Sequence, residues 1–358
     1  MKIGIIGLPQ VGKKLIFGLL TGKDVSGEGA EPIKEPVHGI VTVKDSRLDR
    51  VVSAYTSKKK TPARIETVLM PKLEKDYIKS GRLFEHLEDA DALCHIVRAF
   101  ADDTVYHAEG SPDAARDIDS VNAELILGDL MFIEKRLEKI DRESTKKPDK
   151  RQQEEKALLL RFKQQLEGEM PLRLLELKEA ERKIVASYPF MTLKPSLIAL
   201  NAGEGDADKQ LLSEDFIRKY ERQGAYFTRI SAKIEYELSR LDSEKEKNDF
   251  LRELGIKEPA IGRFTRILYE ALGLISFFTA AGNEARAWMI KKGSTAPEAA
   301  GAIHSDMQKG FIRAEVVKYD DLTKLGGEAK VKEAGRFMIK GKDYIVADGD
   351  ILNIRFSA

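Results

Sequence analysis

The stretch Lys2-Ile3-Gly4-Ile5-Ile6-Gly7-Leu8-Pro9-Gln10-Val11-Gly12-Lys13-Lys14 opens the chain and decides its fold. Its apolar residues predict a short strand, its glycines predict a turn, and residues 15–20 predict a helix. Gly7, Gly12 and Lys13 have the spacing GxxxxGK of a phosphate-binding loop. In such a loop, backbone N–H groups and a helix N-terminus surround an oxyanion, and the lysine reaches the terminal phosphates. We therefore expect a nucleotide's phosphates to contact Gln10, Val11, Gly12, Lys13, Lys14 and Leu15.

The residue after Lys13 departs from this motif. A serine or threonine at that position would hold Mg²⁺, but here it is Lys14, which has three donors and no lone pair for a metal. The loop therefore predicts a nucleotide site without the usual metal. The ammonium group of Lys14 could partly neutralise the phosphates in place of a cation. Alternatively, Lys14 is a solvated side chain on a loop that binds nothing.

Composition sets further limits on the chain. Its 358 residues allow two or three domains, and a net charge of +1 restricts any nucleic-acid contact to a local patch. The one cysteine, Cys94, lies in an apolar run, which predicts a buried core residue, no disulfide within the chain and a reducing compartment. No apolar run reaches the ~18 residues of a membrane span, and Met1 leads directly into a strand. We expect a cytoplasmic protein with no membrane partner.

The first hundred residues alternate between strand-like and helix-like segments, the pattern of an α/β domain. Strands are predicted at residues 39–43, 65–70 and 92–97, and helices at 47–55 and 84–92. The spacing then changes to two apolar stripes separated by the polar residues 142–153, which predicts an antiparallel helical hairpin or a solvated insertion without a partner. The stripes consist of Ile126, Leu130, Ile133, Leu137 and Ile140, and of Leu159, Phe162 and Leu166, with Pro171 interrupting before a further helical stretch at 172–186.

Strand patterns at residues 196–200 and 227–231 indicate that the α/β domain resumes after the hairpin. A helix is predicted over residues 235–272. From residue 274 onward short strands and turns follow, among them an Asp348-Gly349 turn between apolar runs. The chain is thus predicted to contain an α/β domain (residues 1–117 and 190–273), a helical insertion (118–189) and a mixed α+β domain (274–358).

The whole chain resembles the Obg-like ATPase family, the YchF group of translation-factor-related P-loop NTPases. The most specific motifs lie in the last domain, and shorter matches occur at Arg47-Leu48-Asp49, Val97-Arg98 and Leu193-Lys194-Pro195. The resemblance implies an α/β P-loop G-domain, an inserted antiparallel coiled coil and a C-terminal β-grasp domain of the TGS type. The motifs of the last domain are Phe277-Phe278-Thr279-Ala280, Arg286-Ala287-Trp288, Thr295-Ala296-Pro297, Ile303-His304, Gly310-Phe311-Ile312-Arg313-Ala314 and Gly341-Lys342-Asp343-Tyr344.

The resemblance also implies a base-binding site for ATP or GTP. The family has NxxE where related GTPases have NKxD, and here this motif is Asn201-Ala202-Gly203-Glu204. A second family motif, S-A-x-x-E, is present as Ser231-Ala232-Lys233-Ile234-Glu235. The base contacts implied are Asn201, Glu204, Ser231, Ala232 and Lys233. Without the resemblance, Asn201 and Ser231 would be ordinary polar residues at strand ends.

Two further segments lack the metal-linked residues of the family. Ile33 occupies the position of the switch I threonine, while Leu69 and Lys72 replace the aspartate and glycine of DxxG, and the run that follows is shortened to residues 74–81. Because Mg²⁺ is held through these positions in P-loop NTPases, we expect no metal ligand, no catalytic residue and weak or absent hydrolysis. Two alternatives are an ATPase that uses Lys14 or Lys72 instead, and a scaffold with an empty nucleotide pocket.

Other candidate sites are weaker. The five histidines have no metal-ligand spacing. The run Lys58-Lys59-Lys60 is expected to be a solvated turn, although with Lys309 and Arg313 it could face RNA. By analogy, the TGS domain and the coiled coil imply the ribosome or RNA as a partner.

Overall fold

The computed structural model describes residues 1–23, 25, 33–73, 82–107, 110–143, 149–206 and 209–357. The chain divides into two compact units. The first unit contains Met1–Val41 and Glu66–Ile267, and the second contains Thr42–Ile65 and Leu268–Ala358. The α/β class predicted from the sequence is confirmed. The three-part domain division stays a prediction.

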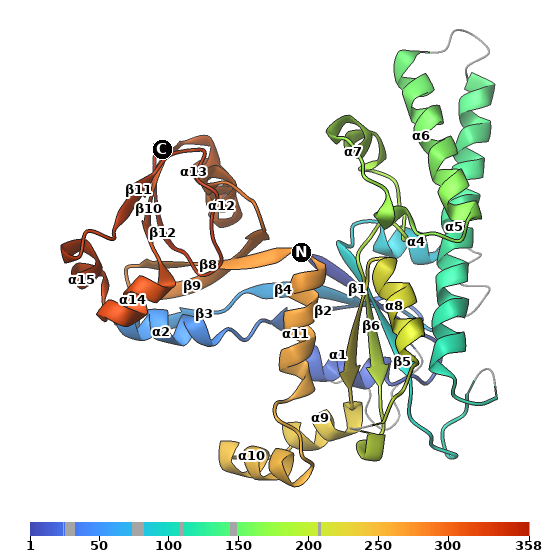
Figure 1. Cartoon of the computed structure of the whole chain (residues 1–358), viewed down its shortest axis with the longest axis horizontal. Helices are drawn as coiled ribbons and strands as arrows, with labels where there is room; N and C mark the ends of the chain where they lie inside the picture. The colour runs from blue at the N-terminus through green and yellow to red at the C-terminus, as the bar shows by residue number, and fades with distance from the viewer. Residues whose placement is uncertain are drawn as a thin grey trace. The chain divides into compact units, whose positions relative to one another are not determined.

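A six-stranded sheet forms the centre of the first unit (Figure 1), in the order β2-β4-β1-β5-β6-β7. Strand β1 pairs in parallel with both β4 and β5, and the parallel ladder continues through β6 to β7. The chain passes from β1 to one side of the sheet and then crosses to β5 on the other side. The carboxyl end of β1 is therefore a topological switch point, where α/β sheets bind ligands. The strands are β1 (Lys2–Ile6), β2 (Val37–Thr42), β4 (Arg64–Leu69), β5 (Ala92–Arg98), β6 (Ser196–Asn201) and β7 (Ala225–Ile230).

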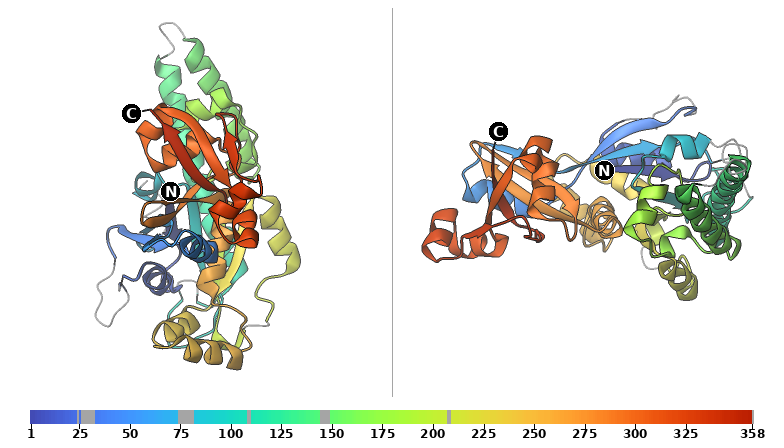
Figure 2. Two further views of the ribbon diagram at one scale, coloured as in Figure 1. Left: turned by 90° about the vertical axis from the view of Figure 1, so that its left-hand side faces the viewer. Right: turned by 90° about the horizontal axis from the view of Figure 1, so that it is seen from above.

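Two long helices form the predicted hairpin, α5 (Ala114–Glu143) and α6 (Lys150–Glu167). Lys163 bonds to Glu134 at 2.8 Å, while Lys156, further back along α6, bonds to Asp141, further along α5. This opposite progression makes the two helices antiparallel, as Figures 1 and 2 show. Both predicted apolar stripes pack in one cluster, which includes Ile133, Ile140, Leu159 and Phe162.

The predicted helix over residues 235–272 is wrong, because three helices occupy this region. A capping box of Ser243 and Glu246 starts a new helix, and Gly255 (φ 67°) and Pro259 separate that helix from the next. The helical stretch predicted at 172–186 is likewise only a 3₁₀ turn (Leu172–Leu174) and a short helix. The other helices of this part of the chain are α1 (Lys13–Thr21), α4 (Arg82–Leu87), α7 (Glu179–Val185), α8 (Glu214–Arg222), α9 (Ala232–Ser239), α10 (Glu244–Glu253) and α11 (Ala260–Ala271).

The second unit has its own sheet, in the order β11-β10-β12-β8-β9-β3. Of the run Lys58-Lys59-Lys60, which was predicted to be a turn, Lys58 lies in a bend, while Lys59 and Lys60 belong to β3, an edge strand parallel to β9. The predicted turn at Asp348-Gly349 is present, with Gly349 at φ 88°. The strands are β3 (Lys59–Thr61), β8 (Leu274–Ala281), β9 (Glu284–Lys291), β10 (Phe311–Val317), β11 (Met338–Lys340) and β12 (Ile351–Phe356), and the helices are α2 (Ser46–Ala54), α12 (Ala296–Ile303), α13 (Ser305–Lys309), α14 (Tyr319–Leu325) and α15 (Glu328–Glu333).

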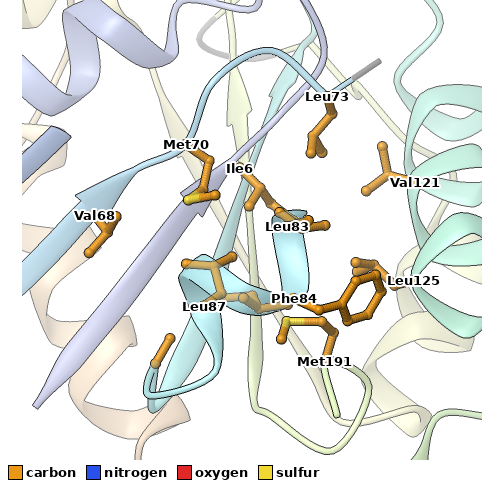
Figure 3. Close-up of a cluster of buried hydrophobic side chains, with 12 residues drawn as sticks. Ile6, Val68, Met70, Leu73, Leu83, Phe84, Leu87, Val121, Leu125 and Met191 are labelled. Atoms are coloured by element: carbon orange, nitrogen blue, oxygen red, sulfur yellow. The ribbon is translucent and has the colours of Figure 1, made fainter. Parts of the chain in front are cut away.

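A buried hydrophobic cluster supports the carboxyl end of β1 (Figure 3). Ile6 from β1 packs there with Met70 and Leu73, which follow β4, and the partly buried Leu8 of the glycine-rich loop packs against the same cluster. The loop therefore rests on the core of the first unit. In the part of the chain that the structure describes, no helix has both the length and the apolar character needed to cross a bilayer.

Candidate functional site

The loop between β1 and α1 adopts a conformation that ordinary loops avoid. Gln10 has φ 57° and Gly12 has φ 88°, both in the left-handed region. This region costs a residue with a side chain about 1–2 kcal/mol. Gly12 is the N-cap of α1, whose first turn contains no acidic residue. The positive end of the α1 dipole therefore meets the loop, an arrangement suited to a bound anion.

Lys13 lies almost entirely inside the protein, with 7% of its surface exposed. Its Nζ donates to the backbone oxygen of Gly7 at 2.7 Å and to that of Pro71 at 2.6 Å. The second contact joins the phosphate-binding loop to the segment after β4, where switch II begins in P-loop NTPases. Pro71 was not among the expected site residues, because every residue has a backbone carbonyl and a sequence motif cannot indicate which one makes a contact.

The positive charge of Lys13 also affects the pKa of a histidine, His95, on the neighbouring strand β5. Burial lowers the pKa of His95 to about 3, with a further contribution from the positive charge of Lys13. The residue is 5% exposed, and the Nε2 of its imidazole has no hydrogen-bond partner within the described residues. His95 is therefore a neutral core residue.

Asn201, at the end of β6, joins the two motifs expected to form the nucleotide site. Its Nδ2 donates to the backbone oxygen of Val11 at 3.0 Å, and its Oδ1 accepts from the backbone N–H of Ala232 at 3.0 Å. Gly12 must be glycine, because a Cβ there would lie 2.3 Å from the Asn201 Nδ2. Both hydrogen bonds are buried, so Asn201 holds the loop at a fixed distance from the start of α9.

The remaining base-site candidates lie around α9. Ser231 is the N-cap of α9 and accepts from the backbone N–H of Ile234 at 3.4 Å. Lys233 and Glu204 form an ion pair at 3.1 Å, with 68% and 41% of their side chains exposed. A hydrogen bond from Lys233 to Glu204 raises the pKa of Lys233. Glu235, the last residue of S-A-x-x-E, is 5% exposed and accepts from the backbone N–H of Ala260, the first residue of α11, at 2.5 Å.

The structure thus brings most of the predicted site residues together. Gln10, Val11, Gly12 and Lys13 form one continuous loop and helix start, which Asn201 connects to Ala232. Lys14 and Leu15, both half-buried, follow in the first turn of α1. Glu204 and Lys233 contact each other, and in the described part of the chain no hydrogen bond joins either to the loop. Their assignment to base contact stays a prediction.

The positions linked to a metal in P-loop NTPases offer no oxygen ligand here. Leu69 is fully buried in β4, Lys72 is exposed, and Ile33 is half-buried and apolar. Magnesium requires oxygen ligands in near-octahedral geometry, which lysine, leucine and isoleucine cannot supply from their side chains. Among the described residues, no cluster of three or more His, Cys, Asp or Glu side chains could hold a metal ion. The residues present therefore do not fit Mg²⁺. The shortened run at 74–81 lies outside the described residues.

Comparison with known proteins shows which family this chain is similar to. The family model YchF-GTPase_C, described as a protein of unknown function (DUF933), matches residues 274–357. The ribosome-binding ATPase YchF of Bacillus subtilis is 39% identical over 367 residues, covering 99% of this chain and 98% of that protein. Obg-like ATPase 1 of Caenorhabditis elegans is 36% identical over 378 residues, covering 100% of this chain and 92% of that protein.

A solved structure agrees with these relatives over nearly the full length. The structure of the Schizosaccharomyces pombe YchF GTPase superposes with a TM-score of 0.80 at 29% sequence identity, covering 99% of this chain and 97% of that one. Sequence identity, coverage and fold therefore all indicate the same family. The chain belongs to the YchF/Obg-like ATPase family.

Proposed function

We propose that this protein binds a purine nucleotide, ATP or GTP, with its phosphates at the N-terminus of α1. The observation that carries the proposal is the Asn201 connection between Val11 and Ala232, which links a phosphate loop to a base loop. On binding, the Lys13 Nζ exchanges its backbone acceptors, Gly7 and Pro71, for phosphate oxygens. Two relatives are named an ATPase and a GTPase, which supports a nucleotide as the ligand.

Binding takes place without Mg²⁺ in this proposal, and turnover is slow or absent. Lys14 stands where the loop would otherwise present a hydroxyl to the metal, and its charge partly neutralises the phosphates together with Lys13. A lysine does not coordinate the β- and γ-oxygens octahedrally, so the polarisation that a metal gives the transition state is missing.

The proposed setting is the cytoplasm, with the ribosome as partner. This part rests on the name of the bacterial relatives, ribosome-binding ATPase YchF, to which the chain is similar over 99% of its length. The nucleotide state would set how strongly the protein associates with the ribosome.

Isothermal titration tests the nucleotide proposal. ATP, ADP and GTP are titrated into the full chain in EDTA, and we expect at least one to bind and Lys13→Ala to abolish binding. The matched control is Lys183→Ala, which removes a lysine that is 74% exposed on α7 of the same unit. Failure of every nucleotide to bind, and to raise the melting temperature, would favour a scaffold with an empty pocket.

An active ATPase is the second candidate, favoured by the relatives that are named as ATPases. Phosphate release measured with and without Mg²⁺ separates the two. The first proposal predicts release near background in both conditions. Turnover well above background that disappears in Lys13→Ala would support the ATPase, with Lys14 or Lys72 supplying charge to the transition state.

A further inference from the structure

A cavity of about 800 Å³ lies beside the helical hairpin, within the first unit. One wall is formed by α5 and the start of α6, and the other by the end of α7 and the residues that follow it, up to Pro189 (Figure 1). An ion pair of 2.9 Å between Arg161 and Glu181 connects α7 to α6. The volume is within the range of about 300–1,000 Å³ that is typical of ligand sites, and nothing in the proposed nucleotide site uses this cavity.

The wall that follows α7 is apolar, and its aromatic ring is held in place. Ile184, Tyr188 and Pro189 line the cavity together with Phe132 of α5. The Tyr188 ring packs against Phe132, with ring centroids 5.2 Å apart, and edge-on against Phe190, at 5.8 Å. Because these neighbours already fix the ring, little order has to be imposed on this wall when a ligand binds, which favours affinity.

Two of the charged residues in the cavity neutralise each other. Arg136 of α5 donates from Nε and Nη2 to the two carboxylate oxygens of Glu155 on α6, at 2.5 and 2.9 Å. The Tyr188 hydroxyl also donates to this carboxylate, and only 9% of the Glu155 side chain is exposed. This ion pair is therefore part of the cavity lining and leaves the attraction of a charged ligand to other residues.

The remaining cations are exposed and spread over both helices. Lys135 and Lys139 lie one turn apart on α5, and Arg151 lies in the first turn of α6. Within the described residues, Lys135 and Arg151 have no ion pair, and Lys139 has only a contact of 3.9 Å with Glu143. Because these positive charges do not converge on one point, they suit a ligand with several separated negative charges rather than a single phosphate group.

The spacing of the two lysines matches the repeat of an extended peptide. Residues four apart on a helix are separated by about 6 Å along its axis. In an extended peptide, side chains two residues apart point to the same side and are about 6.6 Å apart. A peptide in which acidic and apolar residues alternate can therefore place successive carboxylates against Lys135 and Lys139, while the residues between them face the apolar wall.

We propose that this cavity binds an extended acidic peptide of a partner protein, with apolar side chains between its carboxylates. Single-stranded RNA fits less well, because Glu88, Asp149 and Glu155 also line the cavity and RNA carries a negative phosphate at every nucleotide. A peptide can place neutral residues opposite these carboxylates. The inference depends neither on nucleotide binding nor on ribosome association.

Peptide display on the full chain tests the proposal without knowledge of the partner's sequence. A library of random octapeptides is selected in parallel on the wild type and on the double variant Lys135→Glu, Lys139→Glu, in which two charges of the cavity are reversed. We expect the wild type to enrich peptides that combine Asp or Glu with apolar residues, and the variant not to enrich them. No enrichment on the wild type, or the same peptides on both proteins, would overturn the proposal.

Fluorescence anisotropy with the most enriched peptide, labelled with fluorescein, measures the effect. The double variant should bind about tenfold or more weakly, because two attractive contacts become repulsive, and wild-type binding should weaken with added salt. The matched control reverses two exposed lysines elsewhere in the first unit, Lys183→Glu and Lys245→Glu, and should bind within about twofold of the wild type. Equal weakening in the control would assign the effect to overall charge and reject this cavity.

A further variant and a competitor examine the apolar wall and the rival partner. Ile184→Ser should weaken peptide binding about threefold or more without changing its salt dependence, since only apolar contact is removed, and its melting temperature shows whether the fold is retained. Unchanged affinity in a folded Ile184→Ser would contradict the role of the apolar wall. Unlabelled oligouridine should not displace the peptide, and displacement at equal concentrations of negative charge would assign the cavity to RNA instead.

Discussion

Two places in the first unit are each tied to a distant part of the chain by a buried side chain that accepts hydrogen bonds, and the two side chains differ in charge. The phosphate-binding loop is held by Asn201, an amide that is 4% exposed. The base of the helical hairpin is held by Asp129 on α5, which is fully buried and accepts hydrogen bonds from the backbone N–H groups of Met191 and Thr192 at 2.9 and 2.8 Å and from the Thr192 hydroxyl at 2.6 Å. An amide does not titrate, but a carboxyl group does.

The difference gives the two places different responses to pH. Burial raises the pKa of Asp129 to about 6, against the hydrogen bonds from Thr192 and Met191, which lower it. The hairpin base is therefore held less strongly at neutral pH than in mild acid. The Asn201 connection keeps the same strength across this range, so the phosphate-binding loop retains its shape.

The largest effect is expected at Asp129. A carboxyl group with a raised folded-state pKa contributes stability that is full below its ordinary value of 3.8 and is lost as the pH rises through about 6. The free energy of unfolding of the wild type, relative to Asp129→Ala, should therefore fall by about 2.5 kcal/mol between pH 4 and pH 7.5. Urea denaturation of both proteins over this range measures it. The control is Glu138→Ala, an exposed position on the same helix. A loss of stability in Asp129→Ala that does not vary with pH would show that Asp129 and Asn201 respond to pH in the same way.

His95 tests whether the strand beside the phosphate-binding loop has a pH dependence of its own. A histidine whose pKa is lowered contributes stability that is full above its ordinary value of 6.5 and is lost as the pH falls. Between pH 8 and pH 5 the wild type should lose about 2 kcal/mol that His95→Leu does not lose. Denaturation curves at the two pH values give the difference, with the exposed His38→Gln as control. Equal losses in wild type and His95→Leu would show that His95 does not resist protonation.

Asn201→Ala tests the connection whose side chain does not titrate. Removing the side chain leaves the Val11 oxygen and the Ala232 N–H buried without their partner, which should cost about 1–2 kcal/mol at every pH. Nucleotide affinity should fall at least tenfold, because the loop and α9 are no longer joined. Denaturation and titration measure the two effects, and the exposed Asn248→Ala on α10 is the control. A stability penalty that grows or shrinks with pH would mean that Asn201 acts through a titrating neighbour.

The smallest effect is expected at Gln10. Its φ of 57° is unfavourable for a side chain but accessible to glycine. Gln10→Gly should therefore stabilise the first unit by about 0.5 kcal/mol, after the greater entropy of glycine in the unfolded chain is taken into account. Thermal denaturation compares it with Gln10→Ala, which retains the strain and should show no gain. A gain in the alanine variant would place the cost in the glutamine side chain rather than in the backbone.

The parts of the fold that were predictable have local causes. The strand, turn and helix of residues 2–20 follow from apolar periodicity and from glycines whose left-handed conformation the structure requires. The hairpin follows from the spacing of apolar residues on α5 and α6. The loop candidates Gln10–Lys13 and their partner Asn201 were likewise found by motif, and the structure brings them together.

The parts that were missed depend on distant contacts or on weak stop signals. Lys59 and Lys60 look like a solvated run, and only pairing with β9, more than 200 residues later in the chain, makes them a strand. The break between α10 and α11 could have been predicted only if Gly255 and Pro259 had been taken together as a signal that the helix ends. The Lys13 contact with the Pro71 oxygen was not predictable, because any residue at position 71 has a backbone carbonyl.

The central claim is that the phosphate-binding loop is retained while the magnesium ligands are not, and the affinity for ATP with and without Mg²⁺ tests it most directly. Titration of the full chain in EDTA and in excess Mg²⁺ should give dissociation constants within about twofold of each other, because no side chain at Lys14, Ile33 or Leu69 binds the ion. Lys14→Ser should bind more weakly than the wild type in EDTA, since it lacks the second ammonium group. Tightening of wild-type ATP binding by tenfold or more on adding Mg²⁺ would contradict the account.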